Sequence, residues 1–231
     1  MTTISHNLQQ VLERISVACA QAQRSTDAVT LLAVSKTWGA SAVREAYAAG
    51  QTCFGENYIQ EAVDKMDALR DLPLEWHCIG PIQSNKSRLV AENFDWVHTV
   101  DRLKIAQRLS DQRPTHLPPL NICLQVNVDG GPTKSGVEPG QVLALATQVA
   151  ALPRLCLRGI MSIPEPLPVF AQQLVVHQQT RVLFDTIVAA ALPSADRFDT
   201  LSMGMSADLE AAVLAGSSMV RIGTAIFGGR S

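Results

Sequence analysis

Near its start the sequence reads Val29-Thr-Leu-Leu-Ala-Val-Ser-Lys36, a short apolar and β-branched run that ends in a lysine. Such a run is typical of a buried strand, and a lysine after it is usually a surface charge. The other end of the sequence changes this interpretation. It reads Met219-Val-Arg-Ile-Gly-Thr-Ala-Ile-Phe-Gly228, a strand that leads into a Gly-Thr turn whose N–H groups can hold a phosphate. A partly desolvated amine near such a turn favours Schiff-base chemistry with a phosphorylated aldehyde.

Segments with the character of strands and of helices alternate along the rest of the chain. The expected strands cover residues 29–36, 52–56, 74–80, 96–100, 121–128, 157–163, 200–204 and 219–223. The expected helices cover residues 4–23, 40–49, 57–70, 84–92, 102–111, 141–151, 168–190 and 207–214. Eight strands that alternate with helices predict parallel pairing and favour a closed barrel over an open sheet. We therefore expect an α/β fold, a single (β/α)8 TIM-type barrel domain over residues 1–231 with an extra N-terminal helix.

Composition limits the classes of function. The chain has 231 residues, of which 47% are hydrophobic, and this is enough for a full core. A formal net charge of −2 argues against a nucleic-acid partner. The sequence lacks an apolar run of about 18 residues and a signal-peptide pattern, so we expect a cytoplasmic protein with no membrane partner. Five widely spaced cysteines without a C-x-x-C motif indicate reduced thiols rather than disulfides or a zinc site.

Polar side chains gather where the expected strands end, which is where a barrel of this kind has its active site. Each of these groups taken alone is best explained as a strand-end cap or a satisfied buried polar group. Their convergence is harder to explain in that way. The strand ends, in order, hold Ser35-Lys36, Gly55-Glu56-Asn57, His77 and Gly80, His98-Thr99, Gln125 and Asn127, Met161-Ser162, Ser202-Met-Gly-Met-Ser206, and Arg221-Ile-Gly-Thr224.

Two turns are candidates for binding phosphate. Met203-Gly-Met-Ser206 precedes an expected helix, and Ser206 alone is best explained as the N-cap of that helix. Gly223-Thr224 follows the last expected strand, where glycine lets the backbone approach a ligand closely. Barrels frequently bind phosphate at the loops after strands seven and eight, which are the positions of these turns. The nucleotide-binding motifs G-x-x-x-x-G-K-[ST] and G-x-G-x-x-G are absent from the sequence.

Arg221 lies two residues before Gly223, so strand alternation places both on the same face. If Gly223 faces the ligand, Arg221 points into the mouth of the barrel. A cation in that place needs a partner. Two partners are open at this point: a nitrogen atom of a heteroaromatic ring, or a carboxylate such as that of Glu56.

Seven motifs follow one another along the chain. They are Leu32-Ala-Val-Ser-Lys36, Phe54-Gly-Glu-Asn57, Trp76-His-Cys-Ile-Gly80 with Gln83-Ser-Asn-Lys86, Gln125-Val-Asn127 with Lys134-Ser-Gly136, Gly159-Ile-Met-Ser-Ile-Pro164, Leu201-Ser-Met-Gly-Met-Ser206, and Val220-Arg-Ile-Gly-Thr-Ala-Ile-Phe-Gly228. Together they resemble the pyridoxal phosphate homeostasis protein family from about residue 5 to residue 228. The resemblance implies a barrel like the N-terminal domain of alanine racemase that binds pyridoxal 5′-phosphate (PLP).

The resemblance also implies roles for single residues at the two ends of the cofactor. Lys36 would form the internal aldimine with PLP. Ser206, Gly223 and Thr224 would hold the phosphate group. These implied roles agree with what the residues themselves suggest, an amine and a phosphate turn at the same end of one barrel.

At the ring of the cofactor, the resemblance implies that Arg221 faces the pyridine nitrogen, that Asn57 lies near the ring, and that Met161 and His77 belong to the pocket wall. Arginine is always charged and only donates hydrogen bonds, so we expect the ring nitrogen to stay unprotonated and the ring to be a weak electron sink. Alanine racemase, which the site resembles, has a second base from a C-terminal domain. This sequence ends soon after its last motif, and we expect no such domain here.

Two positions depart from the family pattern. The family often has an acidic residue in the loop before Lys134, where this chain reads Asp129-Gly-Gly-Pro-Thr133, and this leaves the role of the loop open. The family often has phenylalanine after His77, where this chain has Cys78. We expect the second departure to change packing only.

Three hypotheses follow for the function. The first is a monomeric PLP carrier that serves PLP homeostasis without robust catalysis, with PLP and either apo PLP-dependent enzymes or free amino acids as partners. The second is a low-efficiency PLP-dependent amino-acid racemase that uses Lys36 and one other base. The third is a class I aldolase-type barrel that uses Lys36 on a sugar phosphate. Arg221 near the phosphate turn, and the lack of a second lysine or tyrosine as proton relay, argue against the third, and we expect the first.

Overall fold

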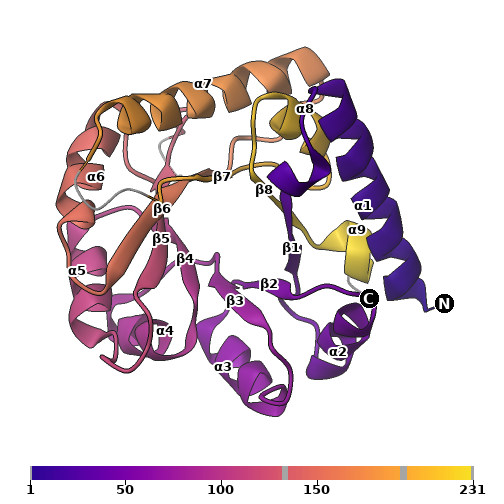
Figure 1. The fold of residues 1–231 in the computed structure, drawn as a ribbon, viewed down its shortest axis with the longest axis horizontal. Coiled ribbons are helices and arrows are strands. Elements are labelled where there is room, and N and C mark those ends of the chain that lie inside the picture. The colour runs from indigo at the N-terminus through magenta and orange to yellow at the C-terminus, as the bar shows by residue number, and fades with distance from the viewer. Residues whose placement is uncertain (1, 132–134, 193–196, 230–231) are drawn as a thin grey trace.

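The computed structural model describes residues 2–131, 135–192 and 197–229. Within these residues eight parallel strands form a closed barrel in sequence order, and the last strand pairs with the first (Figure 1). The expected (β/α)8 fold is therefore confirmed. The strands are β1 (Thr30–Val34), β2 (Cys53–Glu56), β3 (Glu75–Cys78), β4 (Trp96–Val100), β5 (Leu120–Val126), β6 (Leu155–Ser162), β7 (Thr200–Ser202) and β8 (Met219–Ile222).

Helices surround the barrel, as Figure 1 shows in a view along its axis. The α-helices are α1 (Thr3–Gln21), α2 (Ala40–Ala48), α3 (Ile59–Ala68), α4 (Ser87–Asn93), α5 (Leu103–Gln112), α6 (Val142–Ala150), α7 (Phe170–Ala189), α8 (Leu209–Leu214) and α9 (Thr224–Phe227). Short 3-10 turns are η1 (Thr26–Ala28), η2 (Ser84–Lys86) and η3 (Pro139–Gln141). None of the helices in the described residues is long and apolar enough to span a bilayer.

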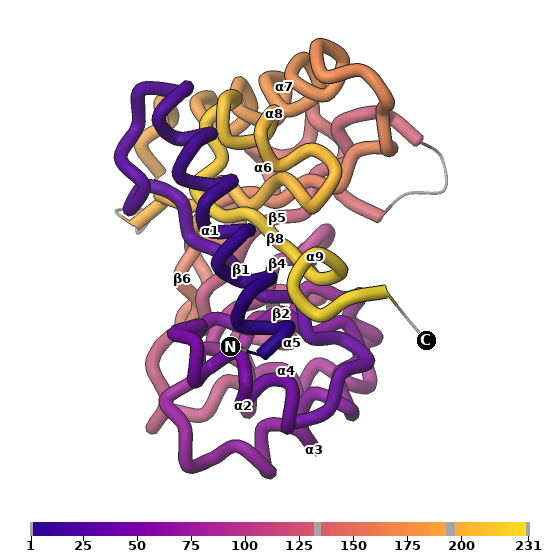
Figure 2. The backbone as a smooth tube through the Cα atoms, turned by 90° about the vertical axis from the view of Figure 1, so that its right-hand side faces the viewer, coloured from indigo at the N-terminus to yellow at the C-terminus, as the bar shows by residue number. Residues whose placement is uncertain are grey.

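The extra N-terminal helix α1 covers the side on which the barrel closes. Figure 2 shows it crossing outside β1 and β8, beside α9, and it packs against α8 and α9. Thr2 begins the helix, since its Oγ1 accepts a hydrogen bond from the N–H of Ser5 at 3.3 Å. One face is apolar at helical spacing, and each aliphatic side chain buried there contributes about 1.5–3 kcal/mol. The buried residues of this face are Ile4, Leu8, Val11, Ile15, Ala18 and Cys19.

Alternation along β1 sorts its side chains between the barrel interior and the helix layer. Leu31 and Ala33 belong to the large core beneath the helices, whereas Leu32 and Val34 form a separate cluster with Ile79 and Met219. Because successive side chains of a strand point to opposite faces, the second set faces the interior. The same parity continues to Lys36, which therefore turns toward the mouth of the barrel.

Candidate cofactor site

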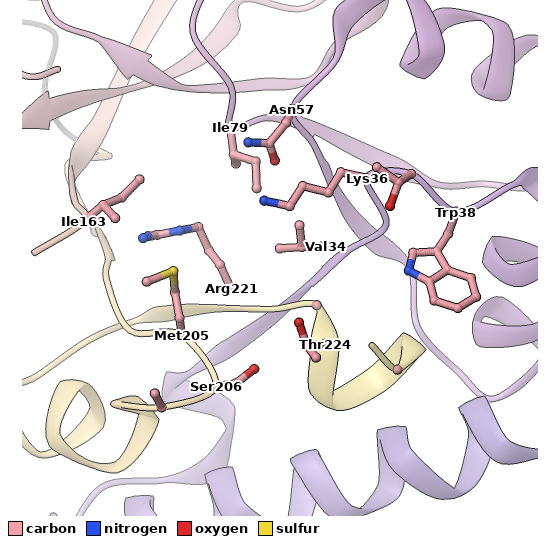
Figure 3. A pocket seen from close by; sticks show the side chains of 14 residues that line it. Val34, Lys36, Trp38, Asn57, Ile79, Ile163, Met205, Ser206, Arg221 and Thr224 are labelled. Carbon is pink, nitrogen blue, oxygen red and sulfur yellow. The ribbon is translucent and has the colours of Figure 1, made fainter. Parts of the chain in front are cut away.

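A cavity of about 330 Å³ opens at the carboxyl ends of the strands. Its size fits a small ligand. Figure 3 shows that its walls come from segments at both ends of the chain. The lining residues are Val34, Lys36, Thr37, Trp38, Asn57, Ile79, Ile163, Met205, Ser206, Ala207, Arg221, Gly223, Thr224 and Gly228.

Lys36 is half-buried, and its side chain extends into the middle of the cavity (Figure 3). No hydrogen bond or ion pair joins its Nζ to any other residue that the structure describes. Directly after it the backbone turns at Thr37, whose φ of 68° lies in the left-handed region that β-branched residues rarely adopt. Such strain costs about 1–3 kcal/mol and is often found at functional sites. The structure thus presents an amine without a partner next to a strained turn.

Buried polar groups on the helix side of β1 hold the strand end that carries Lys36 in place. Ser35 Oγ donates to Glu56 Oε1 at 2.6 Å, and Lys65 Nζ donates to the same oxygen at 2.5 Å and to the Ser35 carbonyl at 2.9 Å. These contacts lie between β1, β2 and α3, in the helix layer. Glu56 is therefore the partner of Lys65, and the alternative that it pairs with Arg221 is wrong.

Arg221 projects from β8 into the interior, as alternation predicted, and only 4% of its surface is exposed. Its Nη1 donates to Ser202 Oγ at 2.8 Å and its Nη2 donates to the Ser162 carbonyl at 2.9 Å. Both acceptors are neutral, and within the described residues no carboxylate forms an ion pair with it. Burial lowers the pKa of Arg221 to about 10, so the guanidinium stays charged at neutral pH. Its remaining N–H groups are available to a ligand.

The two turns expected to bind phosphate meet at one end of the cavity. Figure 3 shows the hydroxyls of Ser206 and Thr224 near each other there. The N–H groups of Ser206, Ala207, Thr224 and Ala225 have no hydrogen-bond acceptor among the described residues. A Cβ on Gly223 would lie 3.1 Å from the Val34 carbonyl oxygen, so glycine allows the close approach of β8 to β1. Unpaired N–H groups and two hydroxyls are the groups that bind phosphate.

One expectation about this turn is wrong, because Ser206 does not cap a helix. Helix α8 begins at Leu209, three residues later than Ser206. The intervening turn is closed by Asp208, whose Oδ1 accepts a hydrogen bond from the Met205 N–H at 2.7 Å and whose Oδ2 lies 2.9 Å from His177 Nε2. Arg14 holds the other side, since its Nη2 donates to the Ser206 carbonyl at 2.9 Å. The Ser206 hydroxyl is therefore left for the cavity.

The side chain of Asn57 indicates that the cavity suits a polar ligand. Its Oδ1 is buried and has no hydrogen-bond partner among the residues that the structure describes, and a buried unpaired acceptor costs about 1–3 kcal/mol. Asn57 also lines the cavity, so a ligand atom can satisfy it. Gly80 makes its position possible, since a Cβ there would be 2.1 Å from the Asn57 carbonyl oxygen. An unsatisfied amide, a free amine and a phosphate turn together fit a phosphorylated aromatic aldehyde.

The structure places two of the expected wall residues outside the cavity. His77 and Met161 are fully buried in the barrel interior, below the cavity. Met161 packs in a cluster with Trp96 and Cys123, whereas both ring nitrogens of His77 contact other side chains. The side chains that reach the cavity belong to residues two positions later, Ile79 and Ile163, each of which directly follows the end of the same strand.

Other lining residues were missed: Trp38 lies outside the seven motifs, whereas Met205, Ile79 and Ile163 lie within motifs but were not assigned to the site. Trp38 stacks on Phe227 with ring centroids 5.8 Å apart and thereby ties the segment after β1 to α9. Met205 lies in the turn before Ser206. Ile79 and Ile163 each lie two residues after an expected wall residue, so strand alternation places them on the same inward face. That alternation could have identified them from the sequence. The expected residues that do come together are Lys36, Asn57, Ser206, Arg221, Gly223 and Thr224.

Comparison with known proteins gives the family. The chain matches the family model of the alanine racemase N-terminal domain over residues 4–231. It is 55% identical over 233 residues to the pyridoxal phosphate homeostasis protein of Escherichia coli, covering 100% of this chain and 98% of that protein. The protein of the same name from Pseudomonas aeruginosa is 56% identical over 230 residues, covering 100% and 97%. The chain therefore belongs to the alanine racemase N-terminal domain family and, within it, to the pyridoxal phosphate homeostasis proteins.

Solved structures agree with this assignment. PipY of Synechococcus elongatus with PLP bound is 37% identical, with a TM-score of 0.84 over 97% of this chain and 100% of that chain. A structure described as that of an unknown protein from Bifidobacterium adolescentis is 32% identical, with a TM-score of 0.92 over 97% of this chain and 94% of that chain. Alanine racemase from Corynebacterium glutamicum shares the fold alone, at 19% identity and a TM-score of 0.65 over 99% and 61%.

Proposed function

We propose that this protein binds PLP in the cavity at the barrel mouth, held covalently by Lys36, and serves intracellular PLP homeostasis and carriage without robust catalysis. The observation that carries the proposal is the position of the Lys36 amine opposite a turn with unpaired N–H groups, neither of which has a partner in the described part of the chain. PLP brings an aldehyde and a ring that can accept electrons. The relative PipY, solved with PLP bound, supports the choice of ligand.

Each part of PLP has a matching group in the cavity. The phosphate suits Ser206, Thr224 and the N–H groups of their turns. The ring nitrogen is an acceptor that suits a donor-only guanidinium, that of Arg221. Lys36 Nζ suits the aldehyde: the nitrogen bonds to the carbonyl carbon, the oxygen leaves as water, and a Schiff base remains. Together these groups match the phosphate, the ring nitrogen and the aldehyde of one ligand.

The cavity provides little for catalysis beyond binding. Among its lining residues in the described structure, none is an aspartate, glutamate, histidine, cysteine or tyrosine, so Lys36 is the one side chain there with the chemistry of a general base. Arg221 keeps the ring nitrogen unprotonated, and a substrate carbanion would gain little stabilisation. A site that binds PLP and offers little further chemistry suits a carrier that exchanges its cofactor with apo PLP-dependent enzymes or with free amino acids.

A direct test is the spectrum of purified protein mixed with PLP and then freed of excess ligand. We expect a visible absorption band that disappears on borohydride reduction, and a mass increase equal to one reduced PLP adduct. The second candidate, a racemase of low efficiency, predicts the same band together with turnover of amino acids. Absence of both band and adduct would reject PLP binding.

A further inference from the structure

Hydrogen bonds run through the interior of the barrel and end at Arg221. Arg221 Nη1 donates to Ser202 Oγ at 2.8 Å, and Ser202 Oγ lies 3.0 Å from His98 Nδ1. His98 Nε2 lies 2.9 Å from His77 Nδ1. His77 Nε2 lies 2.9 Å from Glu75 Oε1. We call the four side chains that lead to Arg221, those of Ser202, His98, His77 and Glu75, the interior relay.

The interior relay joins the two ends of the barrel. Arg221 lines the cavity at the carboxyl ends of the strands. Glu75 is the first residue of β3, at the opposite end, and 45% of its side chain is exposed. Between them Ser202, His98 and His77 are fully buried. The ring of His77 also stacks on that of Trp96, with centroids 5.2 Å apart and planes 10° from parallel, which restricts its rotation.

The ends of the relay determine where its protons lie. Arginine can only donate hydrogen bonds, and an ionised carboxylate can only accept them. A hydrogen bond from His77 holds the pKa of Glu75 below its ordinary value, so Glu75 is ionised at neutral pH. Burial lowers the pKa of both His77 and His98, so both rings are neutral.

With these charges one arrangement satisfies every group. His77 must donate from Nε2 to Glu75, so its Nδ1 accepts. His98 then donates from Nε2 to His77, so its Nδ1 accepts. Ser202 donates to His98 and accepts from Arg221. All the hydrogen bonds therefore point from Arg221 toward Glu75, and chains aligned in this way strengthen their members.

We propose that the interior relay positions Arg221, so that Ser202, His98, His77 and Glu75 set the orientation of the guanidinium toward the ring of the bound cofactor without touching it. This inference rests on the proposed binding of PLP. The other contact of Arg221, to the Ser162 carbonyl, involves backbone and is present in any variant of the relay. Of the two contacts of Arg221, the one to the relay is therefore the one that a substitution elsewhere in the barrel can alter.

A change at Glu75 reaches Arg221 through the donors and acceptors between them. If the acceptor at residue 75 can also donate, His77 can accept at Nε2 and carry its proton on Nδ1. His98 must then accept at Nε2 and donate from Nδ1 to Ser202. Ser202 would accept from both His98 and Arg221, and its own proton would turn away. Glutamine at residue 75 permits this second arrangement, because its amide both donates and accepts.

The first test is a double-mutant cycle on the PLP-bound protein, with Glu75→Gln, Ser202→Ala and both changes together. We expect Ser202→Ala to raise the Kd for PLP about tenfold, the equivalent of about 1.4 kcal/mol, and to shift the visible absorption maximum. Glu75→Gln should cause a smaller shift in the same direction, and that shift should vanish in the Ser202→Ala background. Ser217→Ala, a matched change at a buried serine outside the relay, should leave the spectrum unchanged.

A rescue variant and a metal chelator complete this double-mutant cycle. Ser202→Thr keeps the hydroxyl and should restore the wild-type spectrum. All measurements contain EDTA, because Cys53, Glu75 and His77 lie close enough together to bind an adventitious metal ion. If Glu75→Gln leaves the spectrum unchanged, or shifts it equally with and without Ser202, the relay does not position Arg221.

The second test needs no ligand, so it separates the relay from PLP binding. Nitrogen NMR of the imidazole rings in the unliganded protein should show His77 and His98 as neutral Nε2–H tautomers at neutral pH. Glu75→Gln should add the Nδ1–H form of both rings together. If the wild-type spectrum shows a charged His77 or an Nδ1–H form, the relay is wrong even though PLP binds. If the rings behave as expected and PLP fails to bind, the proposed function is wrong.

Discussion

Lys36 and Arg221 reach one cavity from neighbouring strands that come from opposite ends of the chain (Figure 3). In the register of β1 and β8, Arg221 pairs with Leu32. Alternation then makes Val34 the next residue on the inner face of β1, and Lys36, two residues beyond the end of the strand, continues the same side. An amine and a guanidinium thus share one small volume without a carboxylate partner in the described structure. An anionic ligand offsets the repulsion between two such cations.

Replacing Lys36 tests the covalent link. Lys36→Ala should abolish the borohydride-stabilised adduct and the visible band, because no other described lysine lines the cavity. Intact mass and peptide mapping measure the outcome. Lys86→Ala, which removes a lysine outside the lining, is the matched control and should keep the adduct. Mapping of the adduct to Lys86, or to Lys134, which lies outside the described residues, would show that Lys36 is not the attachment site.

The phosphate turn is tested by Ser206→Ala combined with Thr224→Ala. Each charge-assisted hydrogen bond contributes about 1.5–3 kcal/mol, so the double variant should bind PLP at least about a hundredfold more weakly. Unphosphorylated pyridoxal is the control ligand, and its affinity should change little. Thr224→Ser keeps a hydroxyl and should retain most of the PLP affinity. Equal losses for PLP and pyridoxal in titration would place the phosphate elsewhere.

The barrel and much of the site were predictable because they depend on local periodicity. Eight apolar strand patterns determine closure, and the two-residue period of β8 places Arg221 inside. The position of Lys36 after β1 follows from the same rule. Such features need only the order of the strands and the parity of their residues.

What the sequence could not predict depends on distances within the closed barrel. The alternation of side chains along β3 predicts that His77 points into the barrel, but it does not predict how far His77 lies below the cavity. The next inward residue, Ile79, is the one that lines the cavity. The pairing of His98 with Ser202 joins strands β4 and β7, whose side chains meet only inside the barrel. The prediction that Ser206 caps a helix is wrong because Asp208 accepts the hydrogen bond that closes this turn.

The buried ion pair behind Lys36 should matter for stability. Lys65→Met leaves Glu56 buried without its cation, and removal of one partner of such a pair costs about 3–5 kcal/mol. Urea unfolding should show this loss. Lys104→Met, a matched change at an exposed lysine, should stay within about 0.5 kcal/mol of wild type. Lys65→Met with Glu56→Gln should recover part of the loss. If the single variant is as stable as wild type, the pair does not support the strand end.

Asp208 should make the phosphate turn sensitive to acid. Burial favours a raised pKa, but hydrogen bonds from His177 and from the Met205 N–H hold the pKa of Asp208 below its ordinary 3.8. A carboxyl group with a depressed folded pKa stabilises above the unfolded pKa, and the effect is lost as pH falls through the folded value. Asp208→Asn should therefore be less stable than wild type at pH 7 by about 1.5–3 kcal/mol. The difference should shrink as pH falls below 3.8, and a constant difference in unfolding experiments would contradict it.

The chemistry of the site is tested by α-proton exchange. Incubation with a panel of L-amino acids in D2O, followed by chiral analysis, should give no robust exchange or racemisation. In the proposed complex Arg221 would leave the ring nitrogen unprotonated, and among the described lining residues only Lys36 has the chemistry of a base. The second acid–base group that a racemase needs, which contributes about 10²–10⁴-fold, has no candidate in that lining. Exchange at rates typical of enzymes, lost in Lys36→Ala but kept in Lys86→Ala, would reject the carrier and establish the racemase.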